Sequence, residues 1–174
     1  MRNLRILSFF VFLAIFSLTF ALASEVQLTE DEDTEIIDIN NLILDVVKKY
    51  DTEKIKTNFD KNIKIHLRQN TFKRCLSNLI DNGLSYGNEV KVSTKKTIKD
   101  LIILVDDNGP GIPKEEYEKV IKPFYRIDKS RGQNKSGVGL GLSIANDIVR
   151  SHGGNIFLEK SPLNGLRVKN SLPL

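Results

Sequence analysis

The sequence has no tryptophan, a single cysteine and two histidines among its 174 residues. The lone cysteine, Cys75, excludes an intramolecular disulfide and a cysteine-rich zinc site. Internal repeats are absent, and a chain of this length is typical of one domain with an appendage. The net charge of +4 is modest, and the basic residues form no stripe interleaved with aromatic side chains, so we expect no nucleic-acid partner.

The first 23 residues form a hydrophobic segment. Residues 6–23 carry no charge, follow a basic flank, and end in Ala21-Leu-Ala23, which resembles a signal-peptidase site. As a helix this stretch would be about 27 Å long, just short of a bilayer core of about 30 Å. A cleaved signal, a membrane anchor or a segment of some other origin would each fit this pattern. The acidic residues that follow favour export of the rest of the chain.

The composition divides the chain into the hydrophobic segment 1–23, an acidic linker 24–37 and a domain over 38–174. Apolar residues in the domain recur at helical and at alternating spacing, which indicates a mixture of helices and strands. Asp38 or Asn40 is expected to cap the first helix and Asn70 the longest one, with Gly153 and Gly154 ending the last. We expect helices from about 38–40 to 47, at 70–85, 114–121 and 139–152, strands at 55–59 and 63–67, paired as a hairpin, and further strands at 89–94, 101–105, 156–159 and 166–169. The expected fold is α+β, a two-layer α/β sandwich with a mixed sheet and helices packed on one face.

The longest predicted helix carries residues that weaken it. Asn78 and Asn82 lie four residues apart, so they share one helix face at a separation of about 5–6 Å. Asparagine is a poor residue for a helix interior, and Gly83 costs about 1 kcal/mol relative to alanine. Such conflicts are typical of functional positions. Asparagine amide oxygens suit Mg²⁺, although two asparagines that merely face solvent would give the same pattern.

A second candidate lies where the predicted strand 101–105 leads into a carboxylate and a glycine turn. The Asp107 carboxylate can accept a hydrogen bond from an exocyclic amine, which would select adenine over guanine. Gly109 and Gly111 would let the turn pack flat against a base, because glycine has no Cβ. An ordinary Asp-Asn-Gly turn is the alternative.

The densest glycine cluster, Gly137, Gly139 and Gly141, precedes an apolar pattern at helical spacing. The unpaired N–H groups and the dipole of a helix N-terminus attract anions. The cluster therefore indicates either a polyphosphate held close to the backbone or a flexible loop that caps a helix.

In order and spacing, four motifs together resemble the catalytic domain of sensor histidine kinases. This domain belongs to the Bergerat-fold (GHKL) ATPase superfamily, together with gyrase B, the Hsp90 chaperone and MutL. The resemblance covers about residues 38–174 and looks nearest to osmosensor kinases of the EnvZ type. The matching segments are the N box at 78–82, the G1 box at 107–111, the F box at 122–126, the G2 box at 137–142, and the tails at 151–154 and 172–173.

The resemblance implies a site for ATP and Mg²⁺. Asn82 would be the Mg²⁺ ligand, with Asn78 beside it at the phosphates. Asp107 would bind the adenine amine, and Tyr86 would line the adenine pocket. A lid over about residues 113–137 would close on the substrate, with Lys129, Arg131 and Lys135 adding positive charge. The other cofactor-binding residues would be Gly109, Gly111, Phe124, Arg126, Gly137, Gly139, Leu140 and Gly141.

Several positions depart from the family pattern. Ser85 stands where a basic residue is frequent, which should weaken phosphate binding, while Ile121 and Gly83 replace Phe and Ala. The family phosphorylates a histidine that precedes an acidic residue, on a helical hairpin. His66 and His152 do not fit that pattern, so we expect no catalytic residue and no phosphoacceptor hairpin on this chain.

The first functional hypothesis is that the chain binds Mg-ATP as the catalytic domain of a two-component sensor histidine kinase. The γ-phosphate would pass to a histidine on a dimerisation hairpin supplied in trans, and from there to a response regulator. The alternative is a non-catalytic ATP-binding remnant or regulatory module of a truncated kinase gene. A serine kinase of the anti-sigma-factor kind is a third reading, against which the F and G2 boxes argue.

An ATP site requires the cytoplasmic side of the membrane. We therefore expect residues 1–23 to associate with the membrane, as an anchor in the inner membrane with the ATP domain on its cytoplasmic side. A cytoplasmic fragment is the alternative.

Overall fold

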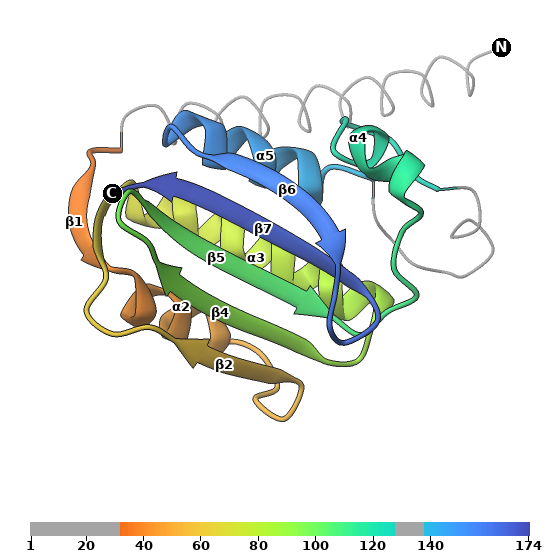
Figure 1. Cartoon of the computed structure of the whole chain (residues 1–174), viewed down its shortest axis with the longest axis horizontal. Helices are drawn as coiled ribbons and strands as arrows, with labels where there is room; N and C mark the ends of the chain where they lie inside the picture. The colour runs from red at the N-terminus through yellow and green to blue at the C-terminus, as the bar shows by residue number, and fades with distance from the viewer. Residues whose placement is uncertain (1–31, 128–137) are drawn as a thin grey trace, which may run out of the picture. The chain divides into compact units, whose positions relative to one another are not determined.

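The computed structural model describes residues 32–127 and 138–174, and Thr34–Leu174 form one compact unit (Figure 1). The hydrophobic segment 1–23 and the lid residues 128–137 lie outside the described residues. Within the two described ranges, no helix is long and apolar enough to cross a membrane. The first strand begins at Glu35, so the folded unit takes in residues 35–37, which the sequence placed in the linker.

A five-stranded mixed sheet forms one layer of the unit (Figure 1). Its strand order is β2-β4-β5-β7-β6, with β2 and β4 parallel and the other neighbours antiparallel. Buried residues alternate along β4 and β7, as expected for a sheet that covers a core on one face. The strands span Ile55–Phe59 (β2), Val90–Lys96 (β4), Asp100–Asp107 (β5), Asn155–Lys160 (β6) and Leu166–Pro173 (β7).

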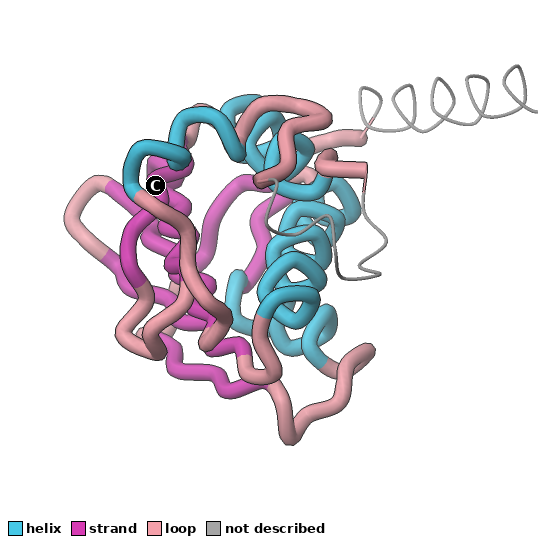
Figure 2. Tube along the Cα trace, turned by 90° about the vertical axis from the view of Figure 1, so that its right-hand side faces the viewer, coloured by secondary structure: helices cyan, strands magenta, loops and turns pink. Residues whose placement is uncertain are grey.

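The second layer consists of the main helices, which pack on one face of this sheet (Figure 2). The long helix α3 (Gln69–Tyr86) packs against both α5 (Gly141–Ser151) and α2 (Ile39–Val47). Two short pieces, η1 (Lys114–Glu116) and α4 (Tyr117–Val120), follow the turn after β5. The arrangement confirms the predicted two-layer α/β sandwich with a mixed sheet.

The apolar stripe of α3 forms the centre of the core. Phe72, Leu76 and Ile80 are buried on it, and the buried Gly83 continues the same face. A Cβ built on Gly83 would lie 2.7 Å from Cγ2 of Val90 on β4. The glycine that lowers helix propensity therefore lets α3 approach the sheet closely.

The predicted hairpin between residues 55–59 and 63–67 is wrong. β2 pairs in parallel with β4, and β3 (Lys64–Leu67) pairs with β1 (Glu35–Asp38) in a separate two-stranded antiparallel sheet. Alternating polarity identifies a strand and its buried face, but it does not identify the partner strand. Here β2 meets β4, which is distant in sequence, instead of the strand that follows it in the chain.

Two of the three predicted helix ends are confirmed. Oδ1 of Asp38 accepts hydrogen bonds from the backbone N–H groups of Asn40 and Asn41 and so caps α2. Gly153 adopts φ +75° after α5, and the N–H groups of Gly153 and Gly154 bond back to carbonyls of the last turn.

The start of α3 is fixed by a histidine instead of the predicted Asn70 cap. The helix begins at Gln69, and Arg68 at the cap position makes no side-chain capping bond. The Arg68 N–H donates to Nε2 of His152 at 3.1 Å, and Nδ1 of His152 lies 2.8 Å from the Ile148 carbonyl oxygen. Both ring nitrogens of His152 therefore face backbone partners, one of them at the residue that precedes α3.

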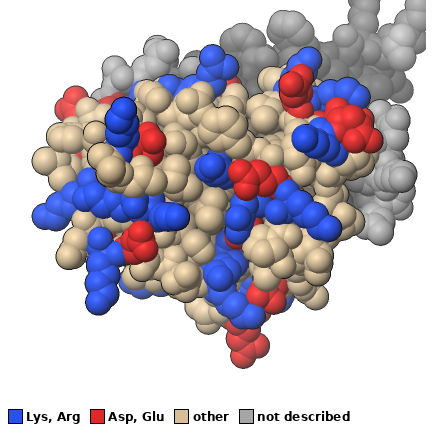
Figure 3. Space-filling model, in the orientation of Figure 1, with Lys and Arg blue, Asp and Glu red and all other residues tan. Residues whose placement is uncertain are grey.

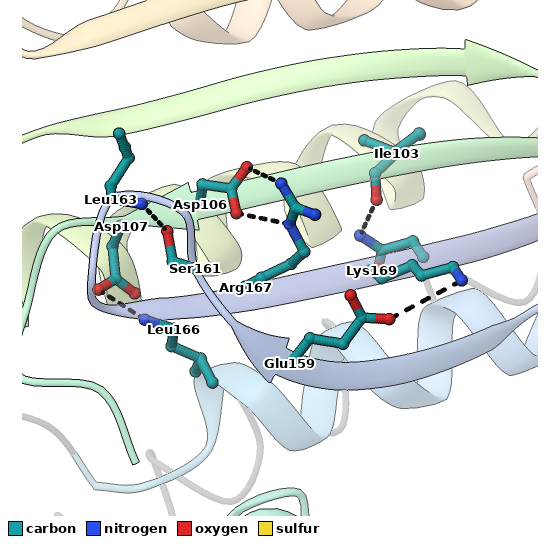
Figure 4. Close-up of polar contacts among 10 residues, drawn as sticks. Ile103, Asp106, Asp107, Glu159, Ser161, Leu163, Leu166, Arg167 and Lys169 are labelled. Carbon is teal, nitrogen blue, oxygen red and sulfur yellow. Dashed lines mark hydrogen bonds and ion pairs between the residues drawn. The ribbon is translucent and has the colours of Figure 1, made fainter.

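The face of the sheet opposite the helices carries charges of both signs (Figure 3). The Arg167 guanidinium donates to both oxygens of the Asp106 carboxylate at 2.7 and 3.0 Å (Figure 4). Further along the face, Lys169 pairs with Glu159 at 3.8 Å. On this face, Asp106 and Glu159 each stand beside a cation and offset its charge locally.

Candidate functional site

Asn78 and Asn82 are half-buried residues of α3. Asn78 lies beside the start of α5, because a Cβ built on Gly141 would be 3.7 Å from the Asn78 carbonyl oxygen and 4.0 Å from its Oδ1. Nδ2 of Asn78 is buried and has no hydrogen-bond partner among the described residues. A buried donor without a partner is costly, so this amide group is suited to meet a ligand.

α5 begins at Gly141, two residues later than the sequence predicts, with Leu140 at the cap position. The Leu140 carbonyl accepts the N–H of Ile144 at 2.9 Å and the hydroxyl of Ser143, also at 2.9 Å. The N–H groups of the first turn of a helix have no acceptor within that helix, so they point toward the residues or the ligand at its N-terminal end. This start of α5 lies against Asn78.

Asp107, the last residue of β5, is only 6% exposed. Its Oδ1 accepts the N–H of Gly109 at 2.8 Å and the N–H of Leu166 at 3.1 Å, the latter drawn in Figure 4. Within the described part of the chain, the hydrogen bonds of this carboxylate all go to Oδ1. Burial raises the pKa of the Asp107 carboxyl, against the two backbone bonds, which lower it. One oxygen is thus fixed while the other stays available as an acceptor.

Glycines hold three backbone segments close around Asp107. A Cβ built on Gly109 would lie 3.0 Å from the Tyr86 carbonyl oxygen at the end of α3. A Cβ on Gly165, in the turn between β6 and β7, would lie 2.5 Å from the Asp107 carbonyl oxygen and 2.6 Å from the Gly109 nitrogen. Gly111 has φ +69°, the left-handed region that favours glycine. Any side chain at Gly109 or Gly165 would push these segments apart.

The F box and the second glycine turn are joined at their bases. The Phe124 N–H donates to the Gly139 carbonyl oxygen at 3.0 Å, and both residues have positive φ, +64° and +78°. The Phe124 side chain is 70% exposed, and Cγ of the half-buried Arg126 would be 3.2 Å from a Cβ on Gly139. The described residues on the two sides of segment 128–137 therefore lie side by side. The remaining predicted lid and turn residues, Lys129, Arg131, Lys135 and Gly137, lie outside the described residues.

These contacts gather three motifs around the C-terminal half of α3. A Cβ on Gly83 would lie 3.4 Å from Cβ of Asp107, and Gly109 packs against Tyr86. One turn earlier on the helix, Asn78 meets Gly141. The helix that carries both asparagines thus touches the turn after β5 and the start of α5.

Residues 67–174 match the family described as histidine kinase-, DNA gyrase B- and HSP90-like ATPase. The chain belongs to this family. The matched range contains α3, the Asp107 turn and the start of α5, so the described region is an ATP-binding catalytic domain of the histidine kinase type.

Individual relatives agree with the family. The sensor histidine kinase GtrS of Pseudomonas aeruginosa is 42% identical over 101 residues, which is 58% of this chain and 20% of GtrS. WalK of Bacillus subtilis, also a sensor histidine kinase, is 33% identical over 147 residues, 80% of this chain and 24% of WalK. The chain therefore spans about a fifth to a quarter of the length of these relatives. The solved histidine kinase domain of the Escherichia coli osmosensor EnvZ is 31% identical with a TM-score of 0.64, over 83% of this chain and 91% of that one.

In this histidine kinase-like domain, two residues that lie beside Asp107 were not predicted from the sequence as part of the site. Gly165 follows Asn164 between two strands, and an Asn-Gly pair at that place is a known hairpin signal that could have drawn attention to it. Asn108 is different, because its place in an Asp-Asn-Gly turn says nothing about its distant partners. Its side chain bonds to residues 88 and 89, after α3.

A hollow of about 600 Å³ opens beside the same turn. Its walls come from residues 110–114, Tyr117, residues 158–160 and the turn at 164–165. Of the predicted site residues it includes Gly111 but neither Asp107 nor Asn82. The candidate site therefore consists of the contacts around α3, and most of this hollow lies outside it.

The donor set for a metal is sparse. In residues 32–127 and 138–174, no group of three His, Cys, Asp or Glu side chains could hold a metal ion. Mg²⁺ usually keeps several waters and binds through one or two protein oxygens together with substrate phosphates. An amide oxygen such as that of Asn82 is of the kind that could ligate an ion arriving with a nucleotide, and the Nδ2 group of Asn78, one turn away, has no partner among the described residues.

Proposed function

We propose that this chain holds Mg-ATP as the catalytic domain of a two-component sensor histidine kinase. The observation that carries the proposal is the junction at α3, where one helix touches both the Asp107 turn and the start of α5. A nucleotide bound along this junction would have its base at Asp107 and its phosphates at the helix N-terminus.

On the base side, Oδ2 of Asp107 would accept a hydrogen bond from the exocyclic amine of adenine. Its orientation is set beforehand, because Oδ1 is held by the N–H groups of Gly109 and Leu166. Guanine would place a carbonyl oxygen at this carboxylate and be repelled. Tyr86, Gly109 and Gly111 would form the adjoining wall.

On the phosphate side, Asn78, Asn82 and the first turn of α5 would surround the anion. The free N–H groups of a helix N-terminus attract phosphate oxygens. Asn82 would ligate Mg²⁺, which when bound neutralises charge on the phosphate oxygens. The phosphate-side turn would consist of Gly137, Gly139, Leu140 and Gly141, with Phe124 and Arg126 at the base of the lid.

The histidine that receives the γ-phosphate would come from a dimerisation hairpin on another chain, which would then pass it to a response regulator. The alternative is an ATP-binding remnant without transfer activity. Ser85 favours weak binding, because its hydroxyl donates to the Asp81 carbonyl at 2.7 Å and supplies no positive charge at this position.

Nucleotide binding is tested by titrating the full chain with ATP and Mg²⁺ in a calorimeter. We expect Asp107→Asn to lower ATP affinity at least about tenfold, since its amide can donate toward the adenine amine instead of accepting. Asn82→Ala should remove the Mg²⁺ dependence of binding. Asn58→Ala, on the exposed part of β2, is the matched control and should bind as the native chain does. Unchanged ATP binding in Asp107→Asn would reject the site.

Transfer is tested separately with a purified histidine hairpin and ATP labelled at the γ-phosphate. Label on the hairpin would support kinase activity, and label absent from it, with ATP still bound, would support the remnant. Acid-stable label on a serine would favour the serine-kinase reading.

We further propose that the ATP domain faces the cytoplasm and that residues 1–23 anchor it at the inner membrane. Cell fractionation should then recover the full-length chain with the membrane. A mature protein that begins at Ser24 and is recovered outside the cytoplasm would contradict the anchor, and a full-length chain in the soluble cytoplasmic fraction would favour the fragment.

A further inference from the structure

The side chain of Asn108 joins the turn after β5 to the segment that follows α3. Its Oδ1 accepts the backbone N–H groups of Asn88 and Glu89 at 2.9 and 3.0 Å. Its Nδ2 donates to Oδ1 of Asn88 at 2.6 Å. The Asn108 backbone adds a fourth bond, from its N–H to the Glu89 carbonyl at 3.2 Å. Both ends of this amide are therefore used between the same two segments.

The segment after α3 is shaped to receive this side chain. A Cβ built on Gly87 would lie 2.5 Å from Oδ1 of Asn108 and 2.9 Å from the Gly109 nitrogen. Only a residue without a side chain leaves room for the amide at this distance. Next to it, the Tyr86 carbonyl stands 3.0 Å from a Cβ built on Gly109. Asn108 and two glycines thus set the spacing between the end of α3 and the turn that begins at Asp107.

We propose that Asn108 is a positioning residue for the base side of the nucleotide site. It would act through its neighbours, by holding Tyr86 at the distance from Asp107 that an adenine ring requires. The inference rests on the proposed function, because it assigns Asn108 a role only if Asp107 and Tyr86 bind the base. The phosphate side would not depend on it, since Asn82 and Asn78 lie about one and two turns before the end of α3 and no bond of Asn108 reaches them.

The test compares affinities for ATP and GTP, with Mg²⁺, in the full chain. Asn108→Ala should lower ATP affinity about tenfold. This is roughly the effect of losing one net hydrogen bond that keeps the binding site in place. GTP affinity should change little, so the ratio of the two affinities should fall by about the same factor. A general loss of folded protein would lower both affinities in parallel and leave the ratio unchanged.

Two further variants separate the contributions of the Asn108 oxygen and of the Asn108 amide nitrogen to the ATP preference. Asn108→Asp keeps an oxygen for the N–H groups of Asn88 and Glu89, so it should restore most of the ATP preference. Asn88→Ala removes only the bond from Nδ2 and should lower the ratio less than Asn108→Ala does. If Asn108→Ala fails to fold, these two variants carry the test: a native ratio in both would then overturn the role.

The outcomes distinguish this inference from the function on which it rests. If Asp107→Asn weakens ATP binding while a folded Asn108→Ala keeps the native ratio, the site stands and the role of Asn108 is overturned. Parallel loss of ATP and GTP affinity in Asn108→Ala also overturns it. If Asp107→Asn leaves ATP binding unchanged, the proposed function itself fails, whatever Asn108 does.

Discussion

The two glycine turns of this domain are held in place by different means. The turn after β5 is fixed by side chains: Asp107 accepts two backbone N–H groups, and Asn108 bonds to residues 88 and 89. The turn before α5 is joined to the F box by the bond from Phe124 to Gly139, between two residues of positive φ.

This difference suggests different tasks for the two turns. A turn locked by side-chain hydrogen bonds keeps its geometry whether or not a ligand is present, which suits recognition of a flat base. A turn that depends on backbone conformation can change by rotating a few dihedral angles, which suits the base of a lid. If the first turn is the more rigid of the two, a substitution there should cost more stability than one in the second turn.

The largest effect is expected from Gly165→Ala. The added Cβ would meet backbone atoms of Asp107 and Gly109 that cannot move independently, so we expect a loss of about 3 kcal/mol in the free energy of unfolding. Urea unfolding followed by circular dichroism measures it. Gly141→Ala is the matched control, because its Cβ would meet only ordinary contacts at 3.7 Å or more. Equal stability of the two variants would contradict a tightly packed first turn.

A smaller effect is expected from Gly139→Ala in the second turn. Positive φ costs a residue with a Cβ roughly 1–2 kcal/mol, and the new atom would lie 2.9 Å from the Tyr125 carbonyl oxygen. We therefore expect a loss of about 1–2 kcal/mol in the same unfolding experiment. A loss as large as that of Gly165→Ala would mean that both turns are equally constrained.

Gly83→Ala tests how closely α3 must approach the sheet beside the first turn. Alanine improves helix propensity by about 1 kcal/mol, but its Cβ would lie 2.7 Å from Cγ2 of Val90. We expect the clash to prevail and to cost about 1 kcal/mol net. The double variant with Val90→Ala should be more stable than the sum of the single effects predicts. Additive effects would show that the contact does not matter.

The smallest effect concerns pH. Burial raises the pKa of Asp107 in the folded state above its ordinary value of 3.8, so the folded protein holds this proton more tightly than the unfolded chain does. The stability from this group is fully present below about pH 3.8 and is lost as pH rises through the folded pKa. Urea unfolding in steps of pH should show the native chain losing stability relative to Asp107→Asn as pH rises, because the asparagine does not titrate. A difference independent of pH would contradict the burial effect.

The sequence predicted the elements better than their partners. The expected strands and the three longer helices exist, because apolar spacing depends only on local periodicity. The helix expected at 114–121 is instead a 3₁₀ helix followed by the four-residue α4, and β1 was not predicted. The pairing of β2 was wrong, since two consecutive alternating segments look like a hairpin whether or not they meet. The start of α3 was also wrong, because its stabilising partner, His152, is 84 residues away along the chain.

Within the site, the sequence by itself determined the order and spacing of four motifs, and these were sufficient to indicate the family that residues 67–174 match. Only the tertiary structure decided how the motifs are held together. Gly165 packs against Asp107 from 58 positions away, and Asn108 reaches back 20 residues to Asn88. Sequence periodicity describes which face of an element is buried, whereas a close contact or a side-chain bond depends on which other backbone passes within a few ångströms of that face.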